Sequence, residues 1–452
     1  MNNAFVSSLI GFGFVCCLAL PLSAAEFPSI DEPASVIGNT LEDFFTAALD
    51  YSPRIRIAEE SMNIGSARIR ASNGQLLPQL NANASLSDND YSAPDLEEKF
   101  KGERYYAQLT QVLFNWQAFS QRNQAYLLKD QLEAEYFAEL AALLTDVATK
   151  YFDVLHAEDA LESIQSELSA VTNQLNLIQS YYDRQLVQIT DLYDAQARLA
   201  AVQADALDVQ SQLALRREAL RAVTGVSAGQ LFRLSDEVTP PPLNESIEHW
   251  VQTARNNSYR IQAAELAQQG AEERISERRG AYMPHVTLVV NQQNSNVGYE
   301  NRPQAKSDSI YFGVDISIPL FAGGRNRAAV SEANSQRNIA ENQLRQVQLD
   351  VSERTRTAYL QVISSESRTT AAAKLAESTA LSATARQRGF ELGTVTSVDV
   401  LNALRDQFQA ERDLLRTRYE HIKYLLVLKQ EAGTLTADDM LEVGSWLTAP
   451  EL

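Results

Sequence analysis

The sequence repeats itself once along its length. Thr40-Leu41-Glu42 corresponds to Ser246-Ile247-Glu248 at an offset of 206 residues, and the same offset relates Arg54-Ile55 to Arg260-Ile261. Further pairs keep the order at offsets of 206 to 208 residues: Leu113-Phe114 with Leu320-Phe321, Ile189-Thr190 with Val395-Thr396, and Gly225 with Gly433. The alternative is chance similarity between two helical stretches, but chance would not place the glycines and the Leu-Phe pairs at nearly the same offset. A duplicated fold is therefore expected.

The duplication predicts two structural repeats, residues 26–233 and residues 246–433. Residues 234–245 contain Pro240-Pro241-Pro242 and are expected to form a linker, followed after the second repeat by a C-terminal tail over residues 434–452. Each repeat is expected to contain a short helix, a second helix, a β-hairpin, a very long helix and a shorter returning helix. Thr40 and Ser246 are predicted N-caps. Pro78 and Pro284 are expected to end the second helix of each repeat.

Alternating polarity predicts β-hairpins over about 79–114 and 285–320. Leu80, Ala82, Ala84 and Leu86 alternate with polar residues, as do the apolar residues from Ile310 to Ile318. This period of two indicates strands with one apolar and one polar face. Asp88–Gly102 and Asn294–Asp308 are polar and are expected to connect the strands. On pattern alone, an ordinary half-exposed sheet remains an alternative.

Coiled-coil hairpins are predicted over about 116–224 and 323–432. No Gly or Pro occurs between Phe114 and Gly225, so one helix from Trp116 to about Tyr181 is expected. At 1.5 Å per residue, such a helix would be ~100 Å long. Apolar residues spaced alternately by three and four positions form a heptad seam: Leu161, Ile164, Leu168, Val171, Leu175, Ile178 and Tyr182. By themselves these hairpins also suit a rod-like structural protein.

The N-terminal residues 1–25 resemble an export signal. An apolar run from Phe5 to Leu22 is followed by Ser23-Ala24-Ala25, which suits cleavage after Ala25. A membrane anchor is the alternative, and cleavage before Cys16 or Cys17 would make a lipoprotein. These are the two cysteines of the chain, so the mature protein would contain no disulfide and no thiolate metal site.

Export and amphipathic hairpins together point to a membrane barrel. Spanning strands must close so that every backbone group is paired, and known barrels need at least about eight strands. Two chains would give a barrel whose bore is filled by side chains, whereas three chains give twelve strands and an opening. The net charge of −19 argues against nucleic-acid binding. A soluble periplasmic coiled-coil scaffold or adaptor is the competing interpretation.

The motifs of the second repeat resemble those of the TolC-like outer-membrane efflux channels. Ile318-Pro319-Leu320-Phe321-Ala322-Gly323-Gly324-Arg325 is similar to the family's junction between strand and helix, and residues 393–401 are similar to its periplasmic helix turn. The resemblance covers Thr40 to Gly433. It implies a mainly α-helical, duplicated chain forming a homotrimer, with a 12-stranded transmembrane β-barrel continuous with a long periplasmic α-helical barrel.

The same resemblance implies a passive duct in the cell outer membrane. Its partners would be a periplasmic adaptor, or membrane fusion, protein and an inner-membrane transporter, either ABC or proton-driven. The exported substrate would be a drug or, in type I secretion, an unfolded protein. No cofactor or metal is implied. The four histidines are scattered and form no metal pair or catalytic triad: His156, His249, His285 and His421.

The periplasmic gate is expected near the two helix turns. Asp191 and Asp399 match acidic members of the family's gate by position. The sequence departs from the best-known pattern because Val395 stands at an arginine position, Phe390 at a tyrosine position and Asn402 at an aspartate position. Three copies of each carboxylate would concentrate cations in the bore. Helix capping is the alternative role for both aspartates.

The turns themselves are expected to dock the adaptor. Two residues of the first turn and three of the second are the candidates: Arg184, Leu186, Gly389, Leu392 and Gly393. Turn geometry is the alternative explanation for the glycines, because Gly393 would readily adopt a positive φ. Gly323-Gly324-Arg325 lacks the spacing of a phosphate-binding loop and is expected to let the chain swing from strand into helix.

Overall fold

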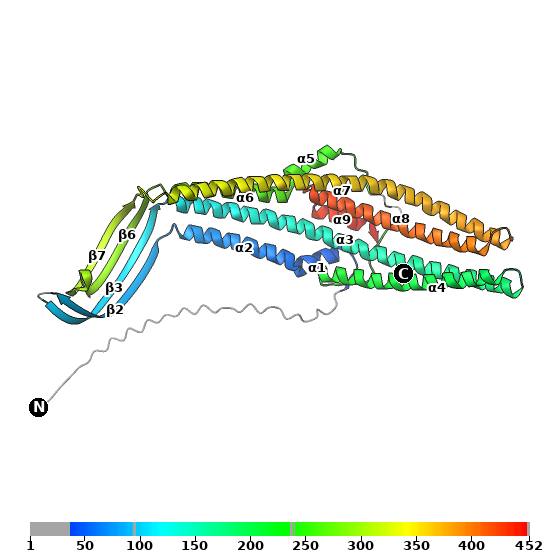
Figure 1. The fold of residues 1–452 in the computed structure, drawn as a ribbon, viewed down its shortest axis with the longest axis horizontal. Coiled ribbons are helices and arrows are strands. Elements are labelled where there is room, and N and C mark those ends of the chain that lie inside the picture. Colours follow the sequence, from blue (N-terminus) through cyan, green and yellow to red (C-terminus); the bar gives the residue numbers. More distant parts are fainter. Residues whose placement is uncertain (1–36, 94–95, 236–237, 239, 450–452) are drawn as a thin grey trace, which may run out of the picture. The chain divides into compact units, whose positions relative to one another are not determined.

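A computed structural model describes residues 37–93, 96–235, 238 and 240–449 (Figure 1). The predicted signal segment 1–25, with Cys16 and Cys17, lies outside the described residues. Among the helices described, none combines the length and the hydropathy needed to cross a bilayer.

Each half begins with a pair of helices. These are α1 (Leu41–Tyr51) and α2 (Pro53–Gly74), and then α5 (Ile247–Asn257) and α6 (Tyr259–Gly280). The predicted N-caps are confirmed, because the hydroxyl of Thr40 accepts from the Asp43 amide at 3.2 Å and that of Ser246 from the His249 amide at 3.3 Å. Pro78 and Pro284 do not end the helices. Both helices stop earlier, in a short series of turns, and the prolines come just before the strands.

The four long strands form one antiparallel sheet in the order β2-β3-β6-β7 (Figure 1). They are β2 (Gln79–Ala93), β3 (Leu96–Phe114), β6 (His285–Val297) and β7 (Pro303–Ser317), with a 3-10 turn, η1 (Tyr299–Asn301), between the last two. The expectation that 88–102 and 294–308 are connections is wrong for most of their length. The strand pairing continues through them, for example between Asp88 and Lys101, and Asp90 binds Lys99 at 3.0 Å.

Strand register gives this sheet one apolar and one polar face. Leu80 lies opposite Leu109, Leu109 opposite Val290, and Val290 opposite Phe312. The next row is polar: Asn81, Gln108, Asn291 and Tyr311. The side chains of Leu80 and Phe312 are 71% and 70% exposed, so the apolar face is bare in the single chain. The outer edges, on β2 and β7, pair with no other strand of the described residues.

The long helices form two antiparallel hairpins, which confirms the helix predicted from Trp116. α3 (Trp116–Asp183) returns as α4 (Ile189–Thr224), and α7 (Arg325–Glu391) returns as α8 (Ser397–Glu431). The heptad seam lies inside, since Ile164, Val171 and Ile178 are buried. They pack in one cluster with residues of α4 and α8, such as Val202 and Leu404. The two hairpins therefore share an apolar core.

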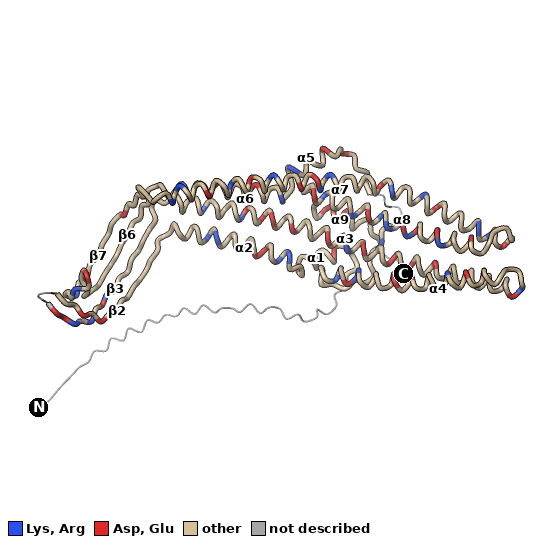
Figure 2. Tube along the Cα trace, viewed as in Figure 1, with Lys and Arg blue, Asp and Glu red and all other residues tan. Residues whose placement is uncertain are grey.

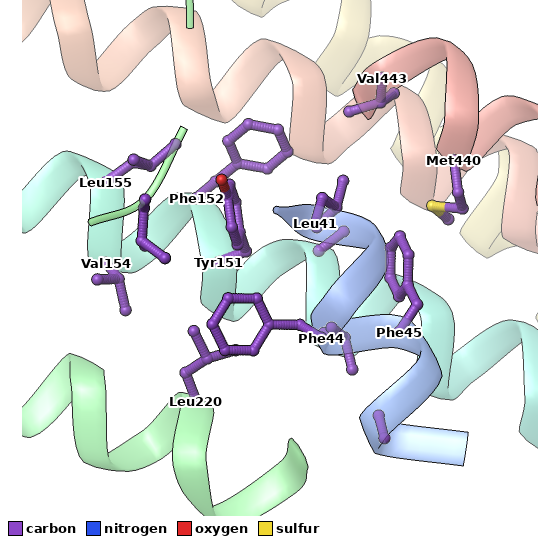
Figure 3. Packing of buried hydrophobic residues seen from close by; sticks show 14 of the residues in the cluster. Leu41, Phe44, Phe45, Tyr151, Phe152, Val154, Leu155, Leu220, Met440 and Val443 are labelled. Atoms are coloured by element: carbon purple, nitrogen blue, oxygen red, sulfur yellow. The ribbon is translucent and has the colours of Figure 1, made fainter. Parts of the chain in front are cut away.

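A second core lies where the short helices meet the long ones (Figure 3). Phe44 of α1 packs edge-on against Tyr151 of α3 at 5.8 Å, and Leu220 of α4 joins them. Four short strands and one short helix complete this core. Short β1 (Ile37–Gly38) pairs with β4 (Ser227–Ala228), β5 (Arg233–Leu234) pairs with β8 (Leu447–Thr448), and α9 (Ala437–Ser445) packs beside them. The proposed tail thus contains a helix and a strand that return to the first half.

Candidate gate and docking site at the helix turns

The two helix turns have the same backbone design. After α3, the Leu186 amide donates to the Tyr181 carbonyl at 2.9 Å; after α7, the Thr394 amide donates to the Gly389 carbonyl at 2.9 Å. Each turn needs one residue with a left-handed backbone. Gly393 supplies it in the second turn with φ 72°, where glycine avoids steric strain, and Gln185 in the first with φ 59°.

The following helices begin with matching caps. Gln188 and Thr396 are the N-caps of α4 and α8, and Asp191 and Asp399 stand three residues later. Structural equivalence at this turn therefore has an offset of 208 residues. The sequence match of Ile189-Thr190 with Val395-Thr396 at 206 is wrong by two residues, because the carboxylate that accepts the N-cap amide fixes the true alignment.

Asp399 caps α8 and also faces an arginine of α7. Its carboxylate accepts from the Thr396 hydroxyl at 2.6 Å and from the Thr396 amide at 3.3 Å. Arg386 lies 3.8 Å from the other carboxylate oxygen. The hydrogen bond from the Thr396 hydroxyl, with smaller contributions from the amide and from Arg386, lowers the pKa of Asp399. The side chain is therefore an anion at neutral pH.

Asp191 joins the two hairpins at their tips. One carboxylate oxygen accepts from the Gln188 amide at 3.1 Å, while the other accepts from the Ser397 hydroxyl at 2.6 Å. Ser397 is the first residue of α8 and is 1% exposed. Sequence reasoning included this serine in a motif but gave it no role. No local pattern marks the contact, because its partner lies in the other half of the chain.

Phe390 and Asn402 lie in different environments. Phe390 is 6% exposed and stacks on Tyr181 of the other hairpin, with ring centroids 5.6 Å apart. Its ring is part of the shared core in this conformation and is not on the surface of the single chain. Asn402 is exposed one turn beyond Asp399 on α8, and Asp406 follows on the same face.

The predicted docking residues lie together in space on two adjoining turns. Arg184, Leu186 and Leu392 are exposed, with 66% of Leu186 and 79% of Leu392 accessible. Gly389 has a packing role, since a Cβ there would come within 2.6 Å of a methyl carbon of Val395. Gly393 has open space around it, so its role in the backbone is the positive φ.

Two charged clusters, which sequence reasoning missed, bind the hairpins together above the turns. Buried Glu167 of α3 binds Arg198 of α4 and, at 2.9 Å, Arg412 of α8. Two heptads earlier, Asp153 of α3 repeats the arrangement with Arg216 at 3.5 Å and Lys423 at 2.7 Å. In the sequence these clusters are marked only by two acidic residues fourteen positions apart in α3, a spacing that does not identify their partners. Across the described ranges, no group of three or more histidine, cysteine or acidic residues is arranged to hold a metal ion.

Known proteins resemble the chain over most of its length. The family described as "Outer membrane efflux protein" matches residues 45–226 and 250–434. The outer membrane protein TolC of Vibrio cholerae is 28% identical over 92% of this chain and 95% of its own length. The alkaline protease secretion protein AprF of Pseudomonas aeruginosa is 24% identical over 90% and 87%.

Solved structures share the fold. CusC superposes with a TM-score of 0.78 at 19% identity, covering 88% of this chain and 93% of its own. The two family matches fall on the two repeated halves, and each contains a β-hairpin and a long helical hairpin. The chain therefore belongs to the outer membrane efflux protein family.

Proposed function

We propose that three copies of this chain form a passive exit duct across the outer membrane. The observation that carries the proposal is the four-stranded sheet, with an apolar face in register and two edges that have no partner strand within the described chain. In a bilayer such edges must be paired. Pairing β7 of one copy with β2 of the next satisfies both, and three copies make a twelve-stranded barrel with room for a bore.

The duct would be one part of an export system. The chain resembles a TolC and a protease secretion protein, so drug efflux and type I protein secretion are both fitting roles. A periplasmic adaptor would bind the duct, and an inner-membrane ABC or proton-driven transporter would supply the energy for export. The family consists of channel proteins, which fits a role without catalysis. The exposed leucines of the two turns, Leu186 and Leu392, offer the adaptor an apolar tip beside Arg184.

The gate would lie at these same turns. Contacts from Asp191 to Ser397 and from Asp399 to Arg386 hold the turns in one arrangement. Threefold symmetry would place three Asp399 carboxylates and three Asn402 amides around the bore. Phe390 would act indirectly, by fixing α7 against α3 through its stacking on Tyr181. Opening then requires the two hairpins to separate at the tip.

Planar-bilayer recording of the purified protein tests the proposal. Stable channels with a preference for cations are expected, and Asp399→Ala is expected to reduce that preference. Asp438→Ala is a matched control, since this exposed carboxylate lies on α9, far along the chain from the turns. Absence of channel activity would refute the duct. Unchanged reversal potentials in Asp399→Ala would remove Asp399 from the gate and leave the duct intact.

A further inference from the structure

Four exposed arginines lie where the helices meet the strands. Arg278 and Arg279 are in the last turn of α6, and Arg325 and Arg327 are in the first turn of α7 (Figure 2). All four side chains are exposed, and none forms an ion pair with a described residue. The nearest acidic residue in sequence, Glu277, is buried and accepts from two glutamines of α3 instead. We refer to these four residues as the arginine belt.

The belt is held together by the fold. The Asn326 side-chain amide donates to the Ala281 carbonyl at 3.2 Å, which ties the start of α7 to the end of α6. Before it, Gly323 and Gly324 adopt φ of 59° and 82°, which turns the chain from β7 into α7 as the sequence predicted. The backbone segments that carry the four charges are therefore held together, between the long strands and the helices α6 and α7.

The segments next to the belt also carry apolar side chains. Leu320 and Phe321 are 92% and 90% exposed, and Tyr282 and Met283 are about half exposed. Trp116 is 41% exposed while its indole N–H donates to Ser276 at 3.0 Å. A ring that is part exposed and has its polar group satisfied is typical of a membrane interface. Exposed apolar side chains thus lie in the same segments as the belt, between the strands and the helices.

Electrostatics within the chain do not explain Arg325 and Arg327. Cations suit the last turn of a helix, as with Arg278 and Arg279, but they oppose the positive end of the dipole in the first turn of α7. The N-cap, Gly324, has no side chain to offset this, and no acidic residue stands in that turn. An external anion would neutralise the arginines and would also interact favourably with the positive end of the α7 dipole.

We infer that the arginine belt binds the phosphate groups of anionic phospholipids at the periplasmic surface of the outer membrane. The inference rests on the membrane placement of the strands in the proposed function. A neighbouring copy fits less well as the partner, because its α2 would bring Arg68 and Arg70 to the belt, and residues 61–74 contain no acid. A phospholipid surface supplies negative charge and an apolar phase on adjacent sides, matching the belt and its surroundings.

Native mass spectrometry of the purified full chain in mild detergent tests the inference. Phosphatidylglycerol is titrated against phosphatidylcholine, and preferential retention of phosphatidylglycerol is expected. Each arginine near a charged surface contributes about 1 kcal/mol, or roughly a fivefold change in affinity. The pair Arg325→Gln with Arg327→Gln is therefore expected to weaken phosphatidylglycerol binding by about 25-fold. The control pair is Arg184→Gln with Arg388→Gln, both exposed and at the far turns.

Equal retention of the two lipids, or equal losses in the belt and control variants, would overturn the inference. Stability without added lipid provides a second measurement. The belt pair is expected to melt no lower than the unaltered protein, because it removes charges that oppose the helix dipole; a lower melting temperature would show a role in folding instead. Oligomer mass in the same spectra reports on the proposed duct separately, so a trimer without lipid preference contradicts only the lipid site.

Discussion

Replacing Glu167 with glutamine should weaken the joint between the two helical hairpins. The Glu167 side chain is 1% exposed and is shared by Arg198 of α4 and Arg412 of α8, which are themselves only 21% and 17% exposed. Glutamine keeps the size of the side chain but removes the charge. Two arginines then remain together in a poorly hydrated site without an anion between them.

The expected cost is large because the pair is buried. Removing one partner of a buried ion pair costs about 3–5 kcal/mol. Because both arginines retain some access to water, the lower end, ~3 kcal/mol, is expected. Asp406→Asn is the matched control: it breaks the contact of Asp406 with Arg405 at 2.8 Å, but these side chains are 56% and 51% exposed. Exposed pairs of this kind contribute at most ~1 kcal/mol.

Urea titration of the detergent-solubilised protein, followed by helical circular dichroism, measures the difference. Glu167→Gln should unfold at a clearly lower urea concentration than Asp406→Asn. The triple variant Glu167→Met, Arg198→Met and Arg412→Met removes all three charges. It should recover much of the lost stability, since no charge is left unpaired. Equal midpoints for Glu167→Gln and Asp406→Asn, or no recovery in the triple variant, would refute the reasoning.

Three further predictions concern the helix turns and α8. Ser397→Ala removes the 2.6 Å bond to Asp191 and should raise single-channel conductance in planar bilayers; an unchanged conductance would separate this bond from gating. Gly393→Ala places a Cβ on a backbone with φ 72° and should destabilise the protein by about 1 kcal/mol in urea titrations, whereas Gly74→Ala, within a helix, should not. Burial lowers the pKa of His421, whose Nδ1 lies 2.8 Å from the Ser365 hydroxyl, so stability present above pH 6.5 should be lost as pH falls below it. His421→Asn should reduce that dependence in melts between pH 7.5 and 5.5, and the part due to half-buried His156, whose pKa is also lowered by burial, should remain.

Local patterns were enough to predict the long helices and the apolar parts of the four long strands, but not α9 or the short strands β1, β4, β5 and β8. The heptad seam placed Ile164 and Val171 inside, and the period of two in β7 placed Phe312 on the apolar face. Both patterns depend on which side of one element is apolar. The polar stretches of the hairpins were misjudged as loops because a strand that extends beyond the apolar band keeps its hydrogen bonds without keeping its alternation.

The candidate site was less accessible to sequence reasoning. Capping by Asp191 and Asp399 follows from short-range spacing and was foreseen as an alternative role. The hydrogen bond between Asp191 and Ser397 joins residues more than 200 positions apart. Glu167 lies between two arginines that belong to two other helices. No periodicity reports such contacts. Burial of Phe390 likewise depends on Tyr181 in the other repeat.

The central claim is that strands of three copies close one barrel in the outer membrane. Membrane fractionation followed by mass determination in mild detergent tests it most directly. A species from the outer membrane with about three times the 50.2 kDa mass of the chain, slightly less after removal of a signal, is the predicted result. A protein released without detergent as a monomer or dimer would contradict the account, because four strands with two unpaired edges could not then lie in lipid.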